Sequence, residues 1–221
     1  MIRCRGILSG VLMLAACVAP DYSPVHDWAQ TASLAADYPP TESAADPFLD
    51  GIVAMQEALT LYLSAIGRLA IDGVLPYRDD PFVDQAMRAA RASERGASSV
   101  AILGGLLKLA THKNYQAPEV GKYILAGDPA VQALLEELET SVDRLARDGE
   151  ARAADMAQYR SILKQIGEGH SVLKTNAGQL TKAEAVYYIR NSEDQLRHAE
   201  AALPRPLLAR PVAPGIDAHP E

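Results

Sequence analysis

The sequence predicts an all-α fold, a helical bundle of about four main helices. Three observations support this prediction. Apolar residues recur every three or four positions over long stretches, as they do on one face of an α-helix. No stretch alternates apolar and polar residues between hairpin signals, as a half-buried strand does. The dipeptide Asp-Pro, a favourable helix start, occurs at 46–47, 80–81 and 128–129.

Residues 1–16 have the features of a secretion signal peptide. Arg3 and Arg5 supply positive charge, and residues 6–16 form an apolar stretch shorter than the roughly 20 residues that span a bilayer. The stretch ends in Leu14-Ala15-Ala16-Cys17, which resembles the lipobox of bacterial lipoproteins. This resemblance covers only the leader, and it implies acylation of Cys17 and cleavage before it. The alternative is an ordinary secretion signal with a chance cysteine.

The lipobox resemblance also implies a location in the cell envelope. In Gram-negative lipoproteins a residue other than Asp after the cysteine permits transfer to the outer membrane, and Val18 stands there. Of the two cysteines, Cys4 leaves with the leader and Cys17 carries the lipid, so the mature chain of 205 residues has no free thiol. Loss of Arg3 and Arg5 lowers the formal charge from −7 to −9, which does not favour nucleic acid. We therefore expect membrane attachment through the lipid anchor.

Residues 17–45 are rich in Pro, Ser and Ala and are expected to form a tether, with one short helix possible around His26 to Ala36. The bundle domain is predicted at 46–203. Asp46 caps its first helix, which Gly73 and Pro76 end. The inward face of this helix consists of large residues at alternating spacings of three and four: Ile52, Met55, Leu59, Tyr62, Ile66 and Leu69.

The second helix is expected to run from Pro81 to about Lys113, with a bend at Gly96. Its apolar run 100–110 predicts a central, largely buried helix, because the run is too short to span a membrane and contains Lys108. Small residues form the face that would allow close packing: Ala86, Ala89, Ala90, Ala97 and Ala101.

A third long helix is predicted to begin at Asp128-Pro129, after a turn at 114–118 and a short helical piece. It carries a four-three repeat typical of a helical bundle seam. The repeat breaks at Gly149 and Arg152, which indicates a bend or a polar layer, and we expect Gly167 and Gly169 to end the helix. The repeat consists of Val131, Leu135, Leu138, Val142 and Leu145, then Met156, Tyr159, Leu163 and Ile166.

The last helix follows a connection at 170–180. Thr181 and Glu184 have the spacing of a capping box. The expected inward face is Ala185, Ile189, Ser192, Leu196, Ala199 and Leu203. Residues 204–221 contain five prolines and are predicted to be a disordered tail.

Few residues suggest a chemical site. The run Gly-Glu-Gly-His ending at His170 could be a mobile loop that presents polar groups, but a helix C-terminus is the favoured interpretation. Asp194 and His198 lie one turn apart and could supply half of a metal site, although a solvated pair is favoured. The sequence has no helical histidine pair four residues apart and no nucleophile elbow. We therefore expect no cofactor and no catalytic site.

These observations favour a non-enzymatic interaction or scaffold module, anchored on the periplasmic side of the outer membrane and bound to a protein partner. One alternative is a small-ligand or metal-binding bundle, for which Asp194, His198 and His170 are the first residues to test. Another is a lipid-anchored inhibitor or immunity-type protein, whose acidic surface would face a basic target.

Overall fold

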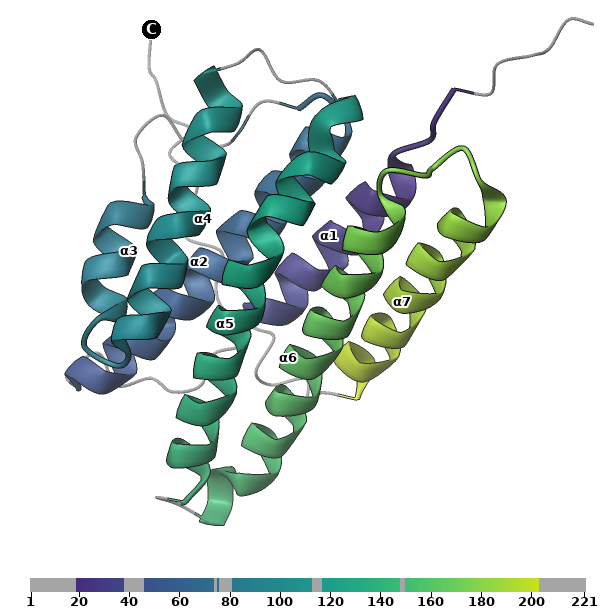
Figure 1. The fold of residues 1–221 in the computed structure, drawn as a ribbon. Coiled ribbons are helices and arrows are strands. Elements are labelled where there is room, and N and C mark those ends of the chain that lie inside the picture. Colours follow the sequence, from purple (N-terminus) through teal and green to yellow (C-terminus); the bar gives the residue numbers. More distant parts are fainter. Residues whose placement is uncertain are drawn as a thin grey trace, which may run out of the picture.

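The computed structural model describes residues 19–37, 46–73, 75, 81–112, 117–147 and 150–202, and it confirms the all-α fold (Figure 1). The leader, Cys17 and the tail 204–221 lie outside the described residues. Within them there are seven α-helices, one 3-10 helix and no strand. The helices are α1 (Ser23–Ala36), α2 (Pro47–Ala70), α3 (Phe82–Ala89), α4 (Glu94–His112), η1 (Ala117–Glu119), α5 (Val120–Arg147), α6 (Glu150–Asn176) and α7 (Ala183–Ala201).

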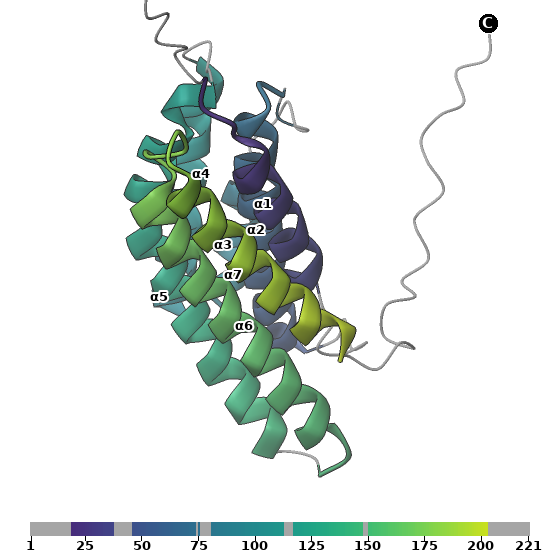
Figure 2. The same cartoon turned by 90° about the vertical axis from the view of Figure 1, so that its right-hand side faces the viewer.

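The helices enclose one hydrophobic core, with α2 at its centre. Helix α2 contacts α1, α3, α4 and α5, while α5 and α6 form an antiparallel pair (Figure 1). Figure 2 shows α7 packed across α6 and α1. Among the described residues, α2 is the one helix long and apolar enough to cross a membrane, but 67% of its most apolar window is buried in the bundle. Helix α2 is therefore the core helix of this fold.

The short helix considered around His26 to Ala36 is present as α1, but the prediction that this segment belongs to a tether is wrong for 23–36. These residues form α1, which packs in the core against α2 and α7. Trp28, Val25 and Ala32 are fully buried, because they lie on one face of α1 at helical spacing. The tether expected before the domain therefore ends at Tyr22, the N-cap residue of α1.

The start of α2 agrees with the prediction. The Asp46 carboxylate accepts a hydrogen bond from the backbone N–H of Phe48 at 2.9 Å, as an N-cap side chain does. All six residues of the predicted inward face of α2 are buried, with at most 3% of their surface exposed.

The expected second helix is two helices. The chain turns at 90–93 between α3 and α4, and Gly96 lies inside α4 with no break there. Gly96 packs closely against the thioether of Met55, so its small size serves packing. The small-residue face is only partly correct, since Ala89 is buried but Ala90 and Ala101 are exposed.

The expectation of a largely buried segment at 100–110 is also wrong. Val100, Leu103 and Leu107 face the core, but Ile102 and Leu109 are more than half exposed. Helix α4 lies at the outside of the bundle beside α3, so only one of its faces can be covered.

Pro129 does not begin a helix. Helix α5 starts nine residues earlier at Val120 and continues through Pro129. Proline cannot donate to the carbonyl four residues back, which weakens the helix there. The flanking residues Ile124 and Val131 are fully buried, and this packing supports the helix across the lost hydrogen bond. Asp128, the residue before Pro129, is buried and points its carboxylate towards His170 on α6.

The four-three seam is confirmed, because its residues are buried except for Leu145, which is partly buried. The seam runs over two antiparallel helices and not over one bent helix, since α5 ends at Arg147 and α6 begins at Glu150; Gly149 lies outside the described residues. The expected helix end at Gly167 and Gly169 is wrong, because α6 continues to Asn176. No described glycine has positive φ, so neither residue serves as a left-handed cap.

The N-terminus of α7 differs slightly from the prediction. Lys182 is the N-cap residue and makes no side-chain capping bond, so the capping box does not form. The inward face is confirmed at Ala185, Ile189, Ser192 and Leu196. Leu203 lies outside the described residues.

Candidate functional site

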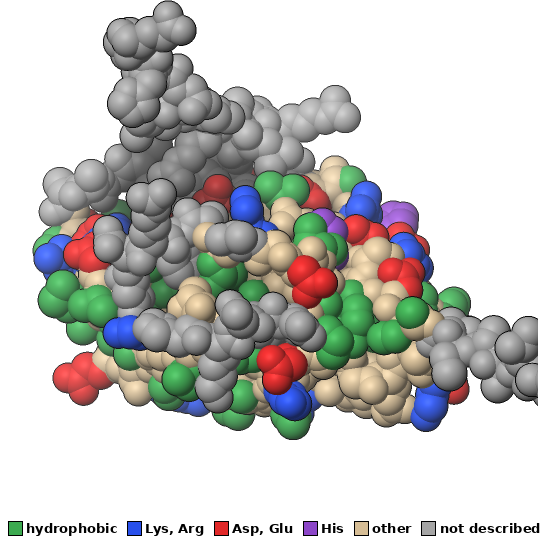
Figure 3. Space-filling model, turned by 90° about the horizontal axis from the view of Figure 1, so that it is seen from above, with side chains coloured by type: hydrophobic (Ala, Val, Ile, Leu, Met, Phe, Trp, Pro, Cys, Tyr) green, Lys and Arg blue, Asp and Glu red, His purple; other side chains and the backbone are tan. Residues whose placement is uncertain are grey.

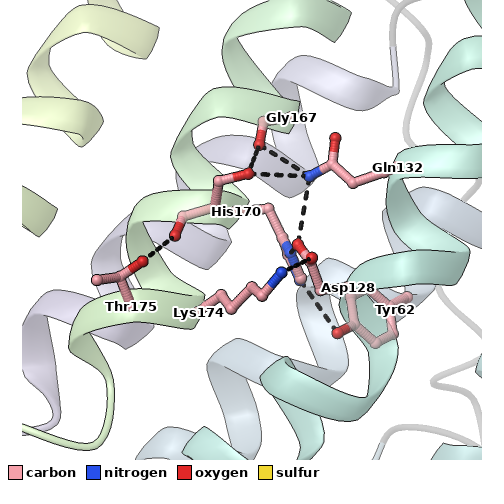
Figure 4. A network of polar contacts seen from close by, with 8 residues as sticks. Tyr62, Asp128, Gln132, Gly167, His170, Lys174 and Thr175 are labelled. Atoms are coloured by element: carbon pink, nitrogen blue, oxygen red, sulfur yellow. Dashed lines mark hydrogen bonds and ion pairs between the residues drawn. The ribbon is translucent and has the colours of Figure 1, made fainter.

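A buried polar network surrounds His170 in the middle of the bundle (Figure 4). Nδ1 of His170 lies 3.0 Å from Oδ1 of Asp128 on α5, and Nε2 lies 3.2 Å from Oη of Tyr62 on α2. A neutral imidazole has one N–H and one acceptor nitrogen. Since a carboxylate can only accept, Nδ1 donates to Asp128, and in the neutral imidazole Nε2 accepts from the Tyr62 hydroxyl. The three side chains therefore form one directed chain of hydrogen bonds across α2, α6 and α5.

Asp128 is the charged centre of this network. Its Oδ2 accepts from Nζ of Lys174 at 2.6 Å, and its Oδ1 also accepts from Nε2 of Gln132 at 3.3 Å. The hydrogen bond from His170, followed by those from Lys174 and Gln132, holds the pKa of Asp128 below its usual range despite its burial. Burial and the charge of Asp128 raise the pKa of Tyr62, so this phenol stays protonated.

Two glycines allow the aromatic residues to reach this network. A Cβ at Gly127 would lie 2.5 Å from Oη of Tyr62, and a Cβ at Gly169 would lie 2.6 Å from the Trp28 ring. The centroid of Trp28 lies 6.4 Å from that of His170 in an edge-on arrangement, and Nε1 of Trp28 donates to Oγ of Ser192 at 3.2 Å. The network therefore connects indirectly to α1 and α7.

A second buried network lies further along the core. Nε2 of Gln56 donates to Oη of Tyr159 at 2.6 Å, and Tyr159 donates to the backbone oxygen of Ala36 at 3.2 Å. Burial raises the pKa of Tyr159, and the hydrogen bond from Gln56 opposes this effect. This network connects α2, α6 and the end of α1.

A shallow groove of about 220 Å³ lies between α5 and α6. Gln132 connects it to the His170 network, because Nε2 of Gln132 also lies 3.0 Å from the Gly167 oxygen and 3.2 Å from Oγ of Ser171. The groove is lined by Gln132, Leu135, Glu136, Glu139, Leu163, Lys164, Gly167, Glu168 and Ser171. Its rim is acidic, but neither His170 nor Asp128 is among its lining residues.

The order carboxylate, imidazole, hydroxyl is one that enzymes use for proton transfer. A catalytic group must contact the reacting atoms, however, and His170 and Tyr62 have no exposed surface. Lys174 and Gln132 are partly exposed, with 43% of the Lys174 side chain accessible. The arrangement therefore joins α2, α5 and α6, and its imidazole and phenol are closed to solvent.

The predicted site residues do not come together. His170 was expected at a helix end or in a loop, but it lies inside α6 and is fully buried. His198 is exposed on α7, with Nδ1 2.6 Å from the backbone oxygen of Asp194 and not bonded to its carboxylate. Within the described part of the chain, no group of three His, Cys, Asp or Glu side chains is placed to hold a metal ion.

Tyr62, Asp128, Gln132 and Lys174 are the members of the network that sequence reasoning missed. Tyr62 was assigned to the apolar face of its helix, and Asp128 was assigned as a cap. Lys174 stands four residues after His170, so one turn of α6 brings both towards Asp128. This spacing is the one signal in the sequence, and it does not identify the partner on α5.

Comparison with known proteins gives no match: no protein-family model, curated protein or solved structure is significantly similar to this chain. Its function must therefore be inferred from its own residues and their arrangement.

Proposed function

We propose that this chain is a lipid-anchored envelope lipoprotein whose helical bundle acts by contact with a protein partner and not by catalysis. Cys17 would carry the lipid and hold the bundle on the periplasmic side of the outer membrane. The observation that carries the non-catalytic part of the proposal is the complete burial of His170.

Burial of His170 supports a structural role for the polar network. The imidazole and the Tyr62 hydroxyl satisfy one another, and Asp128 has three hydrogen-bond donors. Buried polar groups that are fully hydrogen-bonded define a unique packing arrangement. Exposure of His170 and Tyr62 to a substrate would require α2, α5 and α6 to separate, which would disrupt the core.

The outer face of α3 supports a contact function. Val83 and Met87 lie one turn apart on this helix and are 59% and 64% exposed. Arg88 on the same helix pairs with Asp50 at 2.7 Å and with Glu57 at 2.9 Å, which holds α3 against α2. The apolar side chains thus point outward from a fixed helix, as anchors for a partner do.

Photocrosslinking in cells tests the contact surface. A photoreactive amino acid at Val83 or Met87 should give a discrete crosslinked species. The matched control is Lys164 on α6, whose side chain is 72% exposed. Equal crosslinking at all three positions, or none at 83 and 87, would contradict the proposed surface.

The anchor is tested by Cys17→Ser. We expect the unaltered chain to incorporate radiolabelled palmitate and to fractionate with membranes, and the variant to do neither. Palmitate in the Cys17→Ser protein, or its absence from the unaltered chain, would refute the lipoprotein assignment.

A further inference from the structure

Five segments of the chain meet at the end of the bundle where α1 begins. We call this the anchor end and define it as residues 19–23, 68–73, 108–112, 117–125 and 174–190. The Ala117 N–H donates to Oδ1 of Asp72 at 2.6 Å and joins two of these segments, and just beside them Nδ1 of His26 lies 2.8 Å from the Gly67 oxygen. A Cβ at Gly121 would lie 3.5 Å from Ala177, so the start of α5 adjoins the end of α6. Figure 1 shows these helix ends together at the top.

Only a short stretch of chain separates the anchor end from Cys17. The first helix begins at Ser23, six residues after the cysteine. Six residues span at most about 20 Å when fully extended. The tether expected from sequence, 29 residues from Cys17 to Asp46, would have reached about 100 Å. If Cys17 carries lipid, as the proposed function holds, the start of α1 must stay close to the membrane.

The exposed apolar side chains of the bundle are concentrated at this end. The structure has nine exposed large hydrophobic residues among those described, and five belong to the anchor end. These five are Ile71, Leu109, Leu125, Tyr187 and Tyr188, with exposures from 46% to 65%. Tyrosine is enriched at membrane–water interfaces, where its ring and its hydroxyl are both favourably placed. Figure 3 looks onto this end and shows hydrophobic side chains between scattered charged ones.

The lysines have the same distribution. Four of the five described lysines lie at or beside the helix ends that form the anchor end, in a protein whose formal charge is −7. They are Lys108, Lys122, Lys174 and Lys182; Lys174 is held by Asp128 at 2.6 Å, so the other three are the ones expected to contact headgroups. Lysine near a membrane is attracted to anionic phospholipid headgroups and can extend its ammonium group to them. The short tether, the exposed apolar side chains and the lysines therefore all indicate that the anchor end is the surface that faces the membrane.

We propose that the anchor end rests on an anionic phospholipid surface, so that the bundle stands on the membrane with its long axis directed away from it. The inference rests on the proposed lipidation of Cys17. Helix α5 has 28 residues and is about 42 Å long. The α5–α6 reversal is therefore held roughly this far from the headgroups, and α3 projects from the side of the bundle.

Site-specific quenching tests this orientation in the full lipidated protein. The mature chain has no cysteine besides Cys17, so Leu125→Cys and Arg147→Cys each give one site for a fluorophore. Both positions are on α5, about 33 Å apart along its axis. The labelled proteins are reconstituted into vesicles of phosphatidylethanolamine and phosphatidylglycerol that contain spin-labelled lipids. Tyr187→Cys provides a second probe of the anchor end on another helix.

We expect several-fold stronger quenching at 125 and 187 than at 147. Fluorescence of the buried Trp28 reports that each variant is folded. Equal quenching at the three positions in vesicle-bound protein would overturn the orientation and leave the anchor intact. Protein that does not float with the vesicles would overturn the anchor and, with it, the orientation.

Discussion

Gly169 should be intolerant of alanine because of packing. A Cβ there would lie 2.6 Å from Cζ2 and Nε1 of Trp28 and 2.7 Å from Oγ of Ser192. Trp28 is fully buried and hydrogen-bonded to Ser192, so neither group can move without displacing α1 or α7. Gly105 on α4 is the matched control, because a Cβ there meets nothing within 4 Å.

The two substitutions separate packing from helix propensity. Both glycines lie inside helices, so alanine should add about 1 kcal/mol of stability at each site through propensity. Overpacking a well-filled core costs about 1–3 kcal/mol. Gly105→Ala should therefore stabilise the protein by up to about 1 kcal/mol. The free energies of unfolding of the two variants should differ by about 1–3 kcal/mol, with Gly169→Ala the less stable.

Urea unfolding of the soluble chain lacking residues 1–18 measures this difference, with circular dichroism and Trp28 fluorescence as probes. Coincident transitions from both probes would justify a two-state treatment. Equal stability of the two variants, or a more stable Gly169→Ala, would refute the close contact between α1, α6 and α7.

Three further predictions concern the core and the polar network. Ile66→Ala and Leu138→Ala should each cost roughly 2–5 kcal/mol in urea unfolding, and losses below about 0.5 kcal/mol would mean that these faces are not buried. The lowered pKa of Asp128 stabilises the fold above the ordinary value of 3.8, and this contribution is lost as the pH falls below it. Asp128→Asn should therefore lower the free energy of unfolding at neutral pH, and its difference from the unaltered chain should shrink towards about pH 3. A difference in unfolding free energy that does not change with pH would contradict this role of Asp128. His170→Ala should cost at least about 2 kcal/mol, because it leaves the buried Tyr62 hydroxyl without its partner and removes one of the three donors to Asp128, whereas the exposed His198→Ala should stay within about 0.5 kcal/mol. Similar losses at the two histidines would show that the network contributes little.

The fold class and several buried faces could be predicted from sequence because they depend on local periodicity. The apolar face of α2, the seam of α5 and α6 and the inward face of α7 are each defined by residues three or four apart. The Asp46 cap is equally local, since its carboxylate bonds the N–H two residues later. Such patterns are determined by helix geometry and need no knowledge of the neighbouring helices.

The breaks between helices were harder to predict, because local preferences compete there with packing. Pro129 favours a helix start and Gly169 favours a helix end, yet both lie inside long helices. In each case the loss of intrinsic helix stability is offset by contacts that form only in the folded bundle. A short helix at 26–36 was expected within the tether, but its place in the core was missed, since its alanine-rich face gives a weak apolar pattern until α2 and α7 cover it.

By itself, the sequence determined that this chain is all-helical and which faces of its longest helices are buried. The tertiary structure decided that Trp28 belongs to the core and that Tyr62, Asp128 and His170 form one network. His170 is 42 residues from Asp128 and 108 residues from Tyr62 along the chain. Helical periodicity determines only the direction in which a side chain points from the axis of its own helix. Contacts over such separations depend on how whole helices pack, and that is set by the combined shape of the core.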